Sequence, residues 1–336
     1  HGWVVDGQGK TMHKSLGNGI DPSEITDKYG ADILRLWVAS SDYHSDIRIS
    51  KEILGQLSDA YKKIRNTARF ILGNLSNGKG FNPDADSVSD DQLTELDRWA
   101  LMRLDQLIDK ANAGYNAFDF HIVFHAIHNF CVVDMSSFYL DIIKDRLYCE
   151  AEDSVLRRAA QTTMYRVLSG LARLVAPIMS FTAEEIWSYL PHASSDQAES
   201  VFLNDMPQKS SLTFAADFVQ KWSRIYELRL VANKALEEKR NEKLIGKSLE
   251  AKLTVACRFD EDYNMLSGMP EALRDICIVS DLHVIKDESL PTDTPFAVTV
   301  EKAVGDKCER CWAYSETVGT VPEHPTLCAR CAGVVK

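Results

Sequence analysis

The stretch LSDAYKKIRNTARFILGNL, residues 57–75, carries apolar side chains at steps of three and four residues. These positions are Leu57, Tyr61, Ile64, Ala68, Ile71 and Leu75. Because an α-helix turns once in about 3.6 residues, this spacing gathers the apolar side chains on one face. The stretch therefore predicts a long amphipathic helix with one buried side, and the Asn77-Gly78 dipeptide after it predicts a turn.

Further along the chain, the same spacing returns in three long segments, residues 93–111, 121–148 and 154–175. Thr182 and Glu185 have the spacing of a capping box, which predicts a short helix that begins there. Several long amphipathic helices joined by modest loops favour an antiparallel bundle. We therefore predict a mainly α fold in which residues 51–210 form a helical-bundle domain.

Residues 81–97 interrupt the helical segments with six acidic side chains and no basic one. A run of like charge is usually a solvated surface, so we interpret this stretch as a solvated connection rather than a site.

In the second half of the chain, one more helix is expected over about 215–241, and the spacing of apolar residues changes after it. The segments 251–257, 276–286 and 296–303 alternate apolar and polar residues in the manner of strands. We predict a basic helix with a small α/β module over residues 211–303, followed by a separate tail over 304–336.

Composition limits the classes of protein that the chain can belong to. With 336 residues, 45% of them hydrophobic, it can bury the cores of two or three domains. We find no run of 18 uncharged apolar residues and no signal peptide at the start, so we expect a soluble, cytoplasmic protein without membrane contact. We also expect a monomer. The net charge of -11 argues against general nucleic-acid binding, so any RNA contact must use a local basic surface.

The tail carries the strongest local signal. Two Cys-x2-Cys pairs, formed by Cys308, Cys311, Cys328 and Cys331, are separated by sixteen residues, and each pair can supply one edge of a tetrahedral Zn²⁺ site. Four sulfur ligands close the coordination shell, so one structural zinc is predicted. The alternative, two disulfides in a secreted protein, is disfavoured because the chain has no signal peptide. The remaining cysteines are expected to be buried free thiols.

Three side chains beside these ligands, Arg310, Trp312 and Arg330, are candidates for RNA contact through phosphate pairing and base stacking. The alternative for Trp312 is that it merely covers the metal site.

The opening loop, DGQGKTMHKSLGN over residues 6–18, combines glycines with Lys14. Glycines allow backbone amides to approach a phosphate group closely, and a lysine can match its negative charge. Glycine-rich surface turns that contain a lysine are also common, so the loop alone leaves both interpretations open. The spacing is not that of a Walker loop.

The string MHKSLGN resembles the second signature of class I aminoacyl-tRNA synthetases, usually KMSKS followed by Leu/Ile-Gly-Asn. The continuation KYGADILRLWVASSDYHSDIRIS also resembles the isoleucyl, valyl and leucyl members, and FCVVDMSSFYLDIIKDRLY (130–148) resembles their anticodon-binding helical domain. The ending CERCW...CARC is similar to the zinc finger of bacterial-type isoleucyl members. Together these stretches cover essentially the whole chain.

The resemblance implies the C-terminal part of an isoleucyl-type enzyme, starting just before the signature loop. Residues 1–50 would be that loop and the stem-contact region at the end of the nucleotide-binding domain. The full enzyme would use ATP and Mg²⁺ to join isoleucine to isoleucine tRNA.

Within the signature loop, the resemblance implies that Lys14 is catalytic and binds ATP by neutralising its phosphates, with Met12 and Ser15 matching the family. Thr11 and His13 stand where the family has lysine and serine. His13 can donate to a phosphate when protonated, or it can lack a functional duty. Because the first half of the site is absent, we expect this chain alone to be catalytically inert.

Residues 221–252 contain nine Lys/Arg against five Glu, a local charge of +4. Composition alone leaves two alternatives: an RNA-binding face, or a solvated helix with ion pairs. The resemblance places this part near the anticodon arm and favours the first, with Arg240, Lys243 and Lys247 as candidate contacts.

Two other functions stay open at this point. One is a valyl or leucyl relative, disfavoured because such relatives lack a four-cysteine finger at this end. The other is a non-catalytic nucleic-acid-binding zinc module, which has no need of the MHKSLGN loop.

Overall fold

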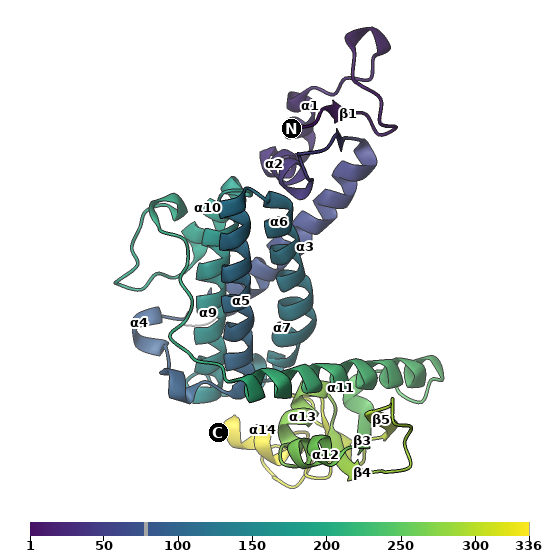
Figure 1. The fold of residues 1–336 in the computed structure, drawn as a ribbon. Coiled ribbons are helices and arrows are strands. Elements are labelled where there is room, and N and C mark those ends of the chain that lie inside the picture. The colour runs from purple at the N-terminus through teal and green to yellow at the C-terminus, as the bar shows by residue number, and fades with distance from the viewer. Residues whose placement is uncertain (77–79, 336) are drawn as a thin grey trace. The chain divides into compact units, whose positions relative to one another are not determined.

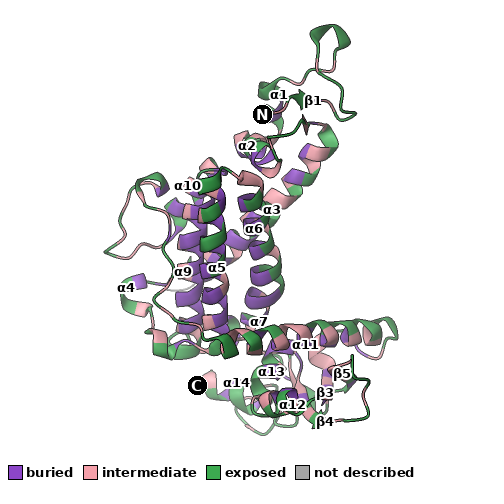
Figure 2. Cartoon of the chain, in the orientation of Figure 1, coloured by how far each residue is buried: buried purple, intermediate pink, exposed green. Residues whose placement is uncertain are grey.

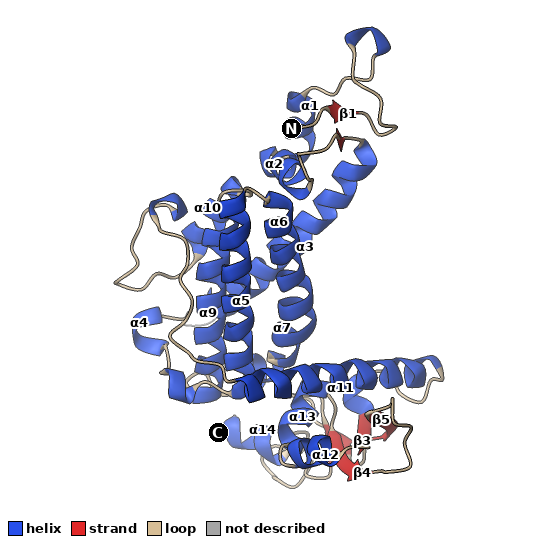
Figure 3. Cartoon of the chain, viewed as in Figure 1, coloured by secondary structure: helices blue, strands red, loops and turns tan. Residues whose placement is uncertain are grey.

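The computed structural model describes residues 1–76 and 80–335, and the predicted Asn77-Gly78 turn lies outside them. Helices dominate these residues, and the strands are few and short (Figure 3). The mainly α fold class is therefore confirmed. Contacts divide the chain into two compact units, His1–Asp141 with Val155–Leu212, and Ile142–Ser154 with Thr213–Lys336. The segment 142–154 thus belongs with the second unit, although the sequence places it inside the predicted bundle range.

The first unit begins with a small region around the opening loop and continues into the helical bundle (Figure 1). Its elements are β1 (Val4–Val5), η1 (Lys14–Leu16), α1 (Pro22–Tyr29), α2 (Ala31–Ser40), β2 (Ile47–Arg48), α3 (Lys51–Ser76), α4 (Pro83–Asp86), η2 (Asp90–Gln92), α5 (Glu95–Ala117), α6 (Phe120–Asn129), η3 (Phe130–Tyr139), α7 (Leu140–Ile142), α9 (Val155–Val175), α10 (Ser180–Tyr189) and η4 (Val201–Leu203).

Helix α3 has the buried face that its apolar spacing predicts. Ile64, Ala68, Ile71 and Leu75 are each at most 1% exposed, while Lys62, Lys63 and Arg69 on the other side are exposed. Burying such a stripe is worth about 1.5–3 kcal/mol for each large apolar side chain. Figure 2 shows the same buried faces along α5 and α9; within the bundle, α9 contacts both α3 and α5.

The predicted helix over 121–148 is interrupted. Its middle, η3, is a π-helix, and the last turns form α7 and then α8 (Lys144–Cys149). Within η3, buried Asp134 pairs with Arg103 at 3.0 Å, and Tyr139 donates a hydrogen bond to buried Asp97 at 2.7 Å. Burial raises the pKa of the Asp134 carboxyl, although Arg103 opposes this shift.

The interpretation of residues 81–97 as a solvated connection is wrong. Phe81 and Pro83 are buried, and two short helices, α4 and η2, hold the segment on α9. Asp86 pairs with Arg158 at 3.0 Å, and Asp90 pairs with Arg166 at 2.6 Å. The acidic run therefore faces arginines about seventy residues away, which the local composition could not reveal.

The predicted capping box at Thr182 and Glu185 is also wrong. Helix α10 begins at Ser180, so Thr182 lies inside it and donates a hydrogen bond to the buried carboxylate of Asp32 at 2.6 Å. Glu185 instead forms a two-bond ion pair with Arg65. The two polar residues that suggest a cap therefore bind other helices: Thr182 binds α2, and Glu185 binds α3.

The opening region is attached to the bundle through α2. Asp32, on α2, accepts hydrogen bonds from the backbone N–H of Thr182 at 2.7 Å and of Phe181 at 3.2 Å. Arg35, one turn later, donates to the carbonyl oxygens of Pro177 and Ile178. These bonds satisfy N–H groups in the first turn of α10 and carbonyl groups in the turn before it, and they fix residues 30–40 in the first unit.

The second unit is built on a three-stranded sheet in the order β4-β3-β5. Its elements are α8, α11 (Ala216–Asn241), η5 (Ser248–Glu250), β3 (Ala251–Cys257), α12 (Asp260–Ser267), α13 (Pro270–Cys277), β4 (Asp281–Lys286), β5 (Phe296–Lys302), β6 (Asp306–Lys307), β7 (Tyr314–Ser315) and α14 (Ala329–Val334). Strand β3 is parallel to β4 and antiparallel to β5. Helix α11 contacts β5, and α12 and α13 contact β4.

The predicted helix over 215–241 and the strands over 251–257 and 296–303 are confirmed to within a residue. The predicted strand over 276–286 is wrong in its first half, because Ile276 and Cys277 end α13 and the strand begins only at Asp281. A parallel connection between β3 and β4 needs a helical crossover, and α12 and α13 supply it.

Candidate functional site

The opening loop is a hairpin held at its base. Val5 is paired with Arg48 on one side and forms a bridge with Thr11 on the other. Asp6 accepts hydrogen bonds through one carboxylate oxygen from the backbone N–H of Gln8 at 3.0 Å and of Lys10 at 2.9 Å. The loop between them therefore has a fixed entry and exit.

Asn18 closes the loop from the far end. Its amide nitrogen donates to Asp6 at 2.9 Å and to the carbonyl oxygen of Thr11 at 3.2 Å, and its carbonyl oxygen accepts from the backbone N–H of His13 at 2.9 Å. The hydrogen bonds from Asn18, Lys10 and Gln8 lower the pKa of the Asp6 carboxyl below its usual range. Sequence reasoning did not select Asp6 or Asn18, although both belong to the string DGQGKTMHKSLGN.

The predicted residues of the loop lie along its exposed part. Lys14 and Ser15 form the short helix η1, which ends at Gly17 with φ +62°, a conformation that favours glycine. Lys14 is exposed, and its ammonium group makes no ion pair or hydrogen bond within the described residues. Met12 is half-buried, whereas Thr11 and His13 are exposed. The loop thus presents one free ammonium group on a framework of hydrogen bonds.

Arg48 adds a second cationic group beside this loop. Its guanidinium lies 3.4–3.7 Å from where a Cβ atom would stand on Gly9, which has φ +83°. Its backbone carbonyl accepts a hydrogen bond from the indole nitrogen of Trp37 at 2.9 Å. Sequence reasoning did not select Arg48, because it lies some forty residues from the glycine that it contacts.

The four tail cysteines converge, as their spacing predicts. Their Sγ atoms all lie within 4.8 Å of one another, and Cys308, Cys328 and Cys331 are buried. The sulfur atoms of Cys311 and Cys328 are 3.9 Å apart. A disulfide requires about 2.05 Å, whereas two thiolates that share a zinc ion at about 2.3 Å each stand almost 4 Å apart. The arrangement therefore fits one structural zinc ion and excludes the disulfide alternative.

Backbone amides also favour thiolates at this site, which we call the cysteine knuckle (residues 304–335). The N–H of Cys328 donates to the sulfur of Cys308 at 3.3 Å. Burial opposes ionisation of Cys308, but hydrogen bonds from the backbone of Cys311, Cys328 and Arg310 outweigh it and lower the thiol pKa to about 6. By contrast, the thiols of Cys131, Cys149, Cys257 and Cys277 are buried and free as predicted, with pKa values raised by burial.

The knuckle is attached to α8 by an ion pair. Arg330 makes two hydrogen bonds to Asp145, at 2.6 and 2.7 Å, and lies 3.7 Å from Glu150. The carbonyl oxygen of Arg310 lies 3.7 Å from the thiol of Cys149. The guanidinium of Arg330, a candidate for RNA contact, is thus paired within the second unit, whereas Arg310, another candidate, contacts α8 through its backbone.

Two of the other candidates, Lys247 and Trp312, contact each other, and Trp312 is 54% exposed. The ammonium group of Lys247 lies 5.2 Å from the centre of its ring, and that of Lys307 lies 5.7 Å from it. The structure therefore joins residues from two separate sequence signals, the basic segment 221–252 and the tail. Lys307, which sequence reasoning did not select, completes this basic aromatic surface of Lys247, Lys307 and Trp312.

Most of the basic residues in α11 are paired. Arg240 donates to Glu237 and Ser248, Lys239 pairs with Glu242, and Arg224 pairs with Asp262. Lys243 lies just after the helix at φ +60°, where its N–H closes the last turn. Much of the positive charge of residues 221–252 is therefore neutralised by ion pairs within the chain, as the second alternative from composition expects.

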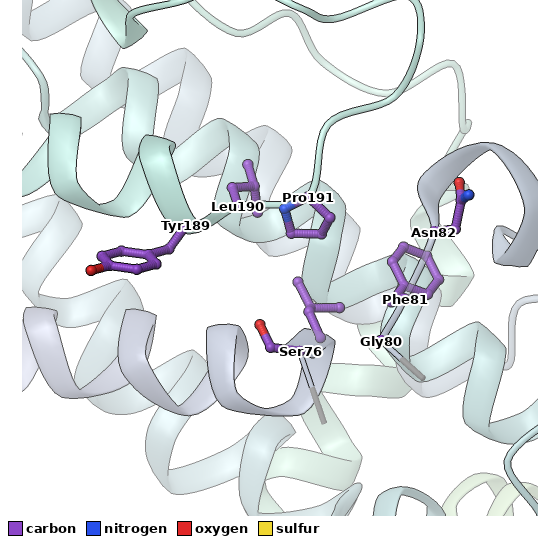
Figure 4. Close-up of a pocket in the computed structure, with 8 residues that line it drawn as sticks. Ser76, Gly80, Phe81, Asn82, Tyr189, Leu190 and Pro191 are labelled. Carbon is purple, nitrogen blue, oxygen red and sulfur yellow. The ribbon is translucent and has the colours of Figure 1, made fainter. Parts of the chain in front are cut away.

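The hollow shown in close-up lies in the first unit, beside the end of α3 and the residues after α10 (Figure 4). Its eight lining residues include Ser76, Phe81, Tyr189 and Pro191, and none of the eight is charged. It therefore offers no charged side chain to a phosphate group or a metal ion. Among the described residues, no helix is both long and apolar enough to cross a membrane.

Comparison with known families gives three matches along the chain. Residues 1–50 match the tRNA synthetases class I (I, L, M and V), residues 97–255 match the anticodon-binding domain of tRNA ligase, and residues 305–333 match the zinc finger found in FPG and IleRS. The last match falls on the four converging cysteines, which agrees with their geometry.

Individual relatives agree with these family matches. The isoleucine--tRNA ligase of Syntrophotalea carbinolica is 50% identical over 342 residues, and that of Caldanaerobacter subterraneus subsp. tengcongensis is 46% identical over 343 residues. Each alignment covers 100% of this chain and 36% of the relative. A solved LeuRS from Agrobacterium radiobacter K84, in a ternary complex with tRNA and LeuAMS, has a TM-score of 0.47 and 22% identity over 62% of this chain and 23% of that one. This structural likeness is too weak to support an argument.

Proposed function

We propose that the chain is the C-terminal part of an enzyme that joins isoleucine to its tRNA, because residues 1–50 match the class I tRNA synthetases and the whole chain aligns with isoleucine--tRNA ligases. The chain spans about a third of those relatives, so its share of the work is limited to the sites described above. The reaction uses ATP and Mg²⁺ as in the class, and isoleucine is favoured over valine or leucine because both relatives named above are isoleucine ligases.

Lys14 is the catalytic residue that we assign to this chain. Its unpaired ammonium group, in a loop framed by Asp6 and Asn18, suits neutralisation of the ATP phosphates as pyrophosphate leaves. Met12, His13 and Ser15 belong to the same ATP-contacting loop. A single lysine loop cannot arrange both reactants, so the chain alone is inert and the rest of the enzyme supplies the other half of the site.

The second unit supplies tRNA binding, and one observation carries this assignment. Trp312 is an exposed indole flanked by two lysines, on a chain whose net charge is -11. An exposed ring can stack on a splayed anticodon base, while the lysines pair with the flanking phosphates. We keep Lys247 and Trp312 as RNA contacts and add Lys307. Arg240 and Arg330 rank below them because both already pair with carboxylates in the chain. Lys243 and Arg310 also rank below them, because the lysines at the ring of Trp312 are Lys247 and Lys307.

A gel-shift series tests this proposal with isoleucine tRNA and the same tRNA carrying a swapped anticodon. The chain should bind the first more tightly at fixed salt, because base contacts carry the sequence information. Lys247→Ala should flatten the dependence of affinity on salt by about one unit, and Trp312→Ala should weaken binding roughly tenfold with little change in slope.

Lys209→Ala is the matched control, because this exposed lysine pairs with Asp109 in the first unit. It should leave both the affinity and the slope unchanged. Equal affinity for the two tRNAs would reduce the surface to a reader of shape, and no binding at low salt would remove the RNA role from this chain.

A further inference from the structure

The two positions at which the signature loop departs from its family contact each other. The hydroxyl of Thr11 lies 3.1 Å from the Nε2 atom of His13. His13 has extended backbone angles, φ -134° and ψ 140°, so the side chains of residues 11 and 13 fall on the same side of the chain. A change at one position is therefore felt directly at the other.

The backbone around this pair is fixed by one side chain. Asn18 donates to the carbonyl oxygen of Thr11 and accepts from the N–H of His13, so both residues are anchored to the same amide group. The next residue is Lys14, whose ammonium group is free within the described part of the chain. The Thr11–His13 pair thus stands at a fixed place beside the cation that we assign to ATP.

The hydrogen bond also decides which ring nitrogen can reach a ligand. If the Thr11 hydroxyl donates to Nε2, the neutral ring carries its proton on Nδ1. Nδ1 has no partner within the residues that the structure describes, and the side chain of His13 is exposed. In this tautomer, the Nδ1–H donor points away from Thr11.

We propose that Thr11 and His13 act as one unit, in which the Thr11 hydroxyl orients the His13 ring and the Nδ1–H group of His13 binds a phosphate oxygen of ATP next to Lys14. This proposal rests on the proposed function and adds a specific contact to it. Threonine is much shorter than the lysine that usually occupies position 11 and does not extend as far toward the phosphates. The ring of His13 makes up part of this difference in length. His13 is then a binding residue and Thr11 a positioning residue that acts through it.

The test uses the full-length ligase and isoleucine-dependent exchange of pyrophosphate into ATP. His13→Ala removes the donor and should lower kcat/KM for ATP roughly tenfold, mainly through KM for ATP, with KM for isoleucine unchanged. Thr11→Val keeps the shape of the side chain but removes the hydroxyl, and should lower the same ratio about threefold.

A double variant distinguishes between one coupled unit and two residues that contact ATP independently. Because Thr11 acts only through His13, Thr11→Val combined with His13→Ala should be no worse than His13→Ala alone. His125→Ala, an exposed histidine on α6, is the matched control and should leave exchange unchanged.

Restoring the usual residues gives a second, independent readout. Thr11→Lys combined with His13→Ser should retain exchange, whereas Thr11→Lys alone should be poorer because it keeps the ring and removes the hydroxyl that orients it. The proposed unit would be wrong if the losses in kcat/KM for ATP from Thr11→Val and His13→Ala multiply in the double variant. It would also be wrong if His13→Ala leaves KM for ATP unchanged. Failure of the unmodified ligase to exchange with isoleucine would instead overturn the proposed function.

Discussion

The signature loop (residues 6–18) and the cysteine knuckle are both short, glycine-bearing segments with little apolar core, yet they are held in opposite ways. Polar hydrogen bonds through Asp6 and Asn18 organise the loop, and most of its residues are exposed. Four sulfur atoms organise the knuckle from inside, where Cys308 and Cys331 have no exposed surface. A two-bond ion pair from Arg330 to Asp145 then attaches it to α8.

The difference separates a movable site from a rigid one. A hydrogen bond in water contributes only about 0.5–1.5 kcal/mol, so the loop can rearrange at small free-energy cost. A structural zinc site contributes about 10–16 kcal/mol of binding free energy, which is also folding free energy. The knuckle should therefore be ordered or unfolded as a whole, depending on its metal.

The largest expected effect follows from removal of one metal ligand. Cys308→Ser should abolish zinc binding, which we expect at one ion per chain, and should make residues 304–335 sensitive to protease while the helical bundle keeps its circular dichroism.

Cys277→Ala provides the control, because this buried thiol on α13 lies outside the cluster. It should keep its zinc. A knuckle that stays folded and protease-resistant without metal would show that zinc does not hold it together, and the proposed difference between the two segments would be wrong.

A smaller effect is expected when the loop loses its central amide. Asn18→Ala removes three hydrogen bonds, including the one accepted from the backbone N–H of His13. Hydrogen exchange at the His13 amide should accelerate roughly tenfold, while protection in α3 should not change.

Asn66→Ala, at an exposed position on α3 in the same unit, is the matched variant and should leave the loop unaffected. An unchanged rate at His13 after loss of Asn18 would mean that backbone pairing alone organises the loop.

The smallest effect is a pH dependence of loop order. The hydrogen bonds from Asn18 and from the backbone of Lys10 and Gln8 lower the pKa of Asp6 below 3.8. A carboxylate with a lowered pKa stabilises structure above its unfolded pKa and loses that contribution as pH falls through the lowered value. Amide chemical shifts of Gln8 and Lys10 should therefore titrate together in the acid range.

The variant Asn18→Ala sharpens this titration, because it removes the largest cause of the lowered pKa. The midpoint should move upward toward 3.8. A midpoint that stays in place would show that the backbone amides alone stabilise the carboxylate.

Much of this architecture is determined by local sequence. The apolar spacing of α3 specifies its buried face, because helical geometry places residues three and four apart on one side. The same holds for β3 and β5, whose alternation gives nearly the observed bounds. The two Cys-x2-Cys pairs identify the knuckle, since each short loop fixes two sulfur atoms as neighbours wherever the rest of the chain runs.

Contacts between distant segments decided the rest. Asp86 and Asp90 suggest a solvated segment in the sequence, but in the fold they pair with Arg158 and Arg166. Thr182 suggests a helix cap, but its hydroxyl donates a hydrogen bond to Asp32. Lys247 and Trp312 lie 65 residues apart in the sequence, yet their side chains meet on one surface. Local periodicity is set by backbone geometry and can be read from the chain, whereas the partner of a charged or aromatic side chain depends on which segments folding brings together.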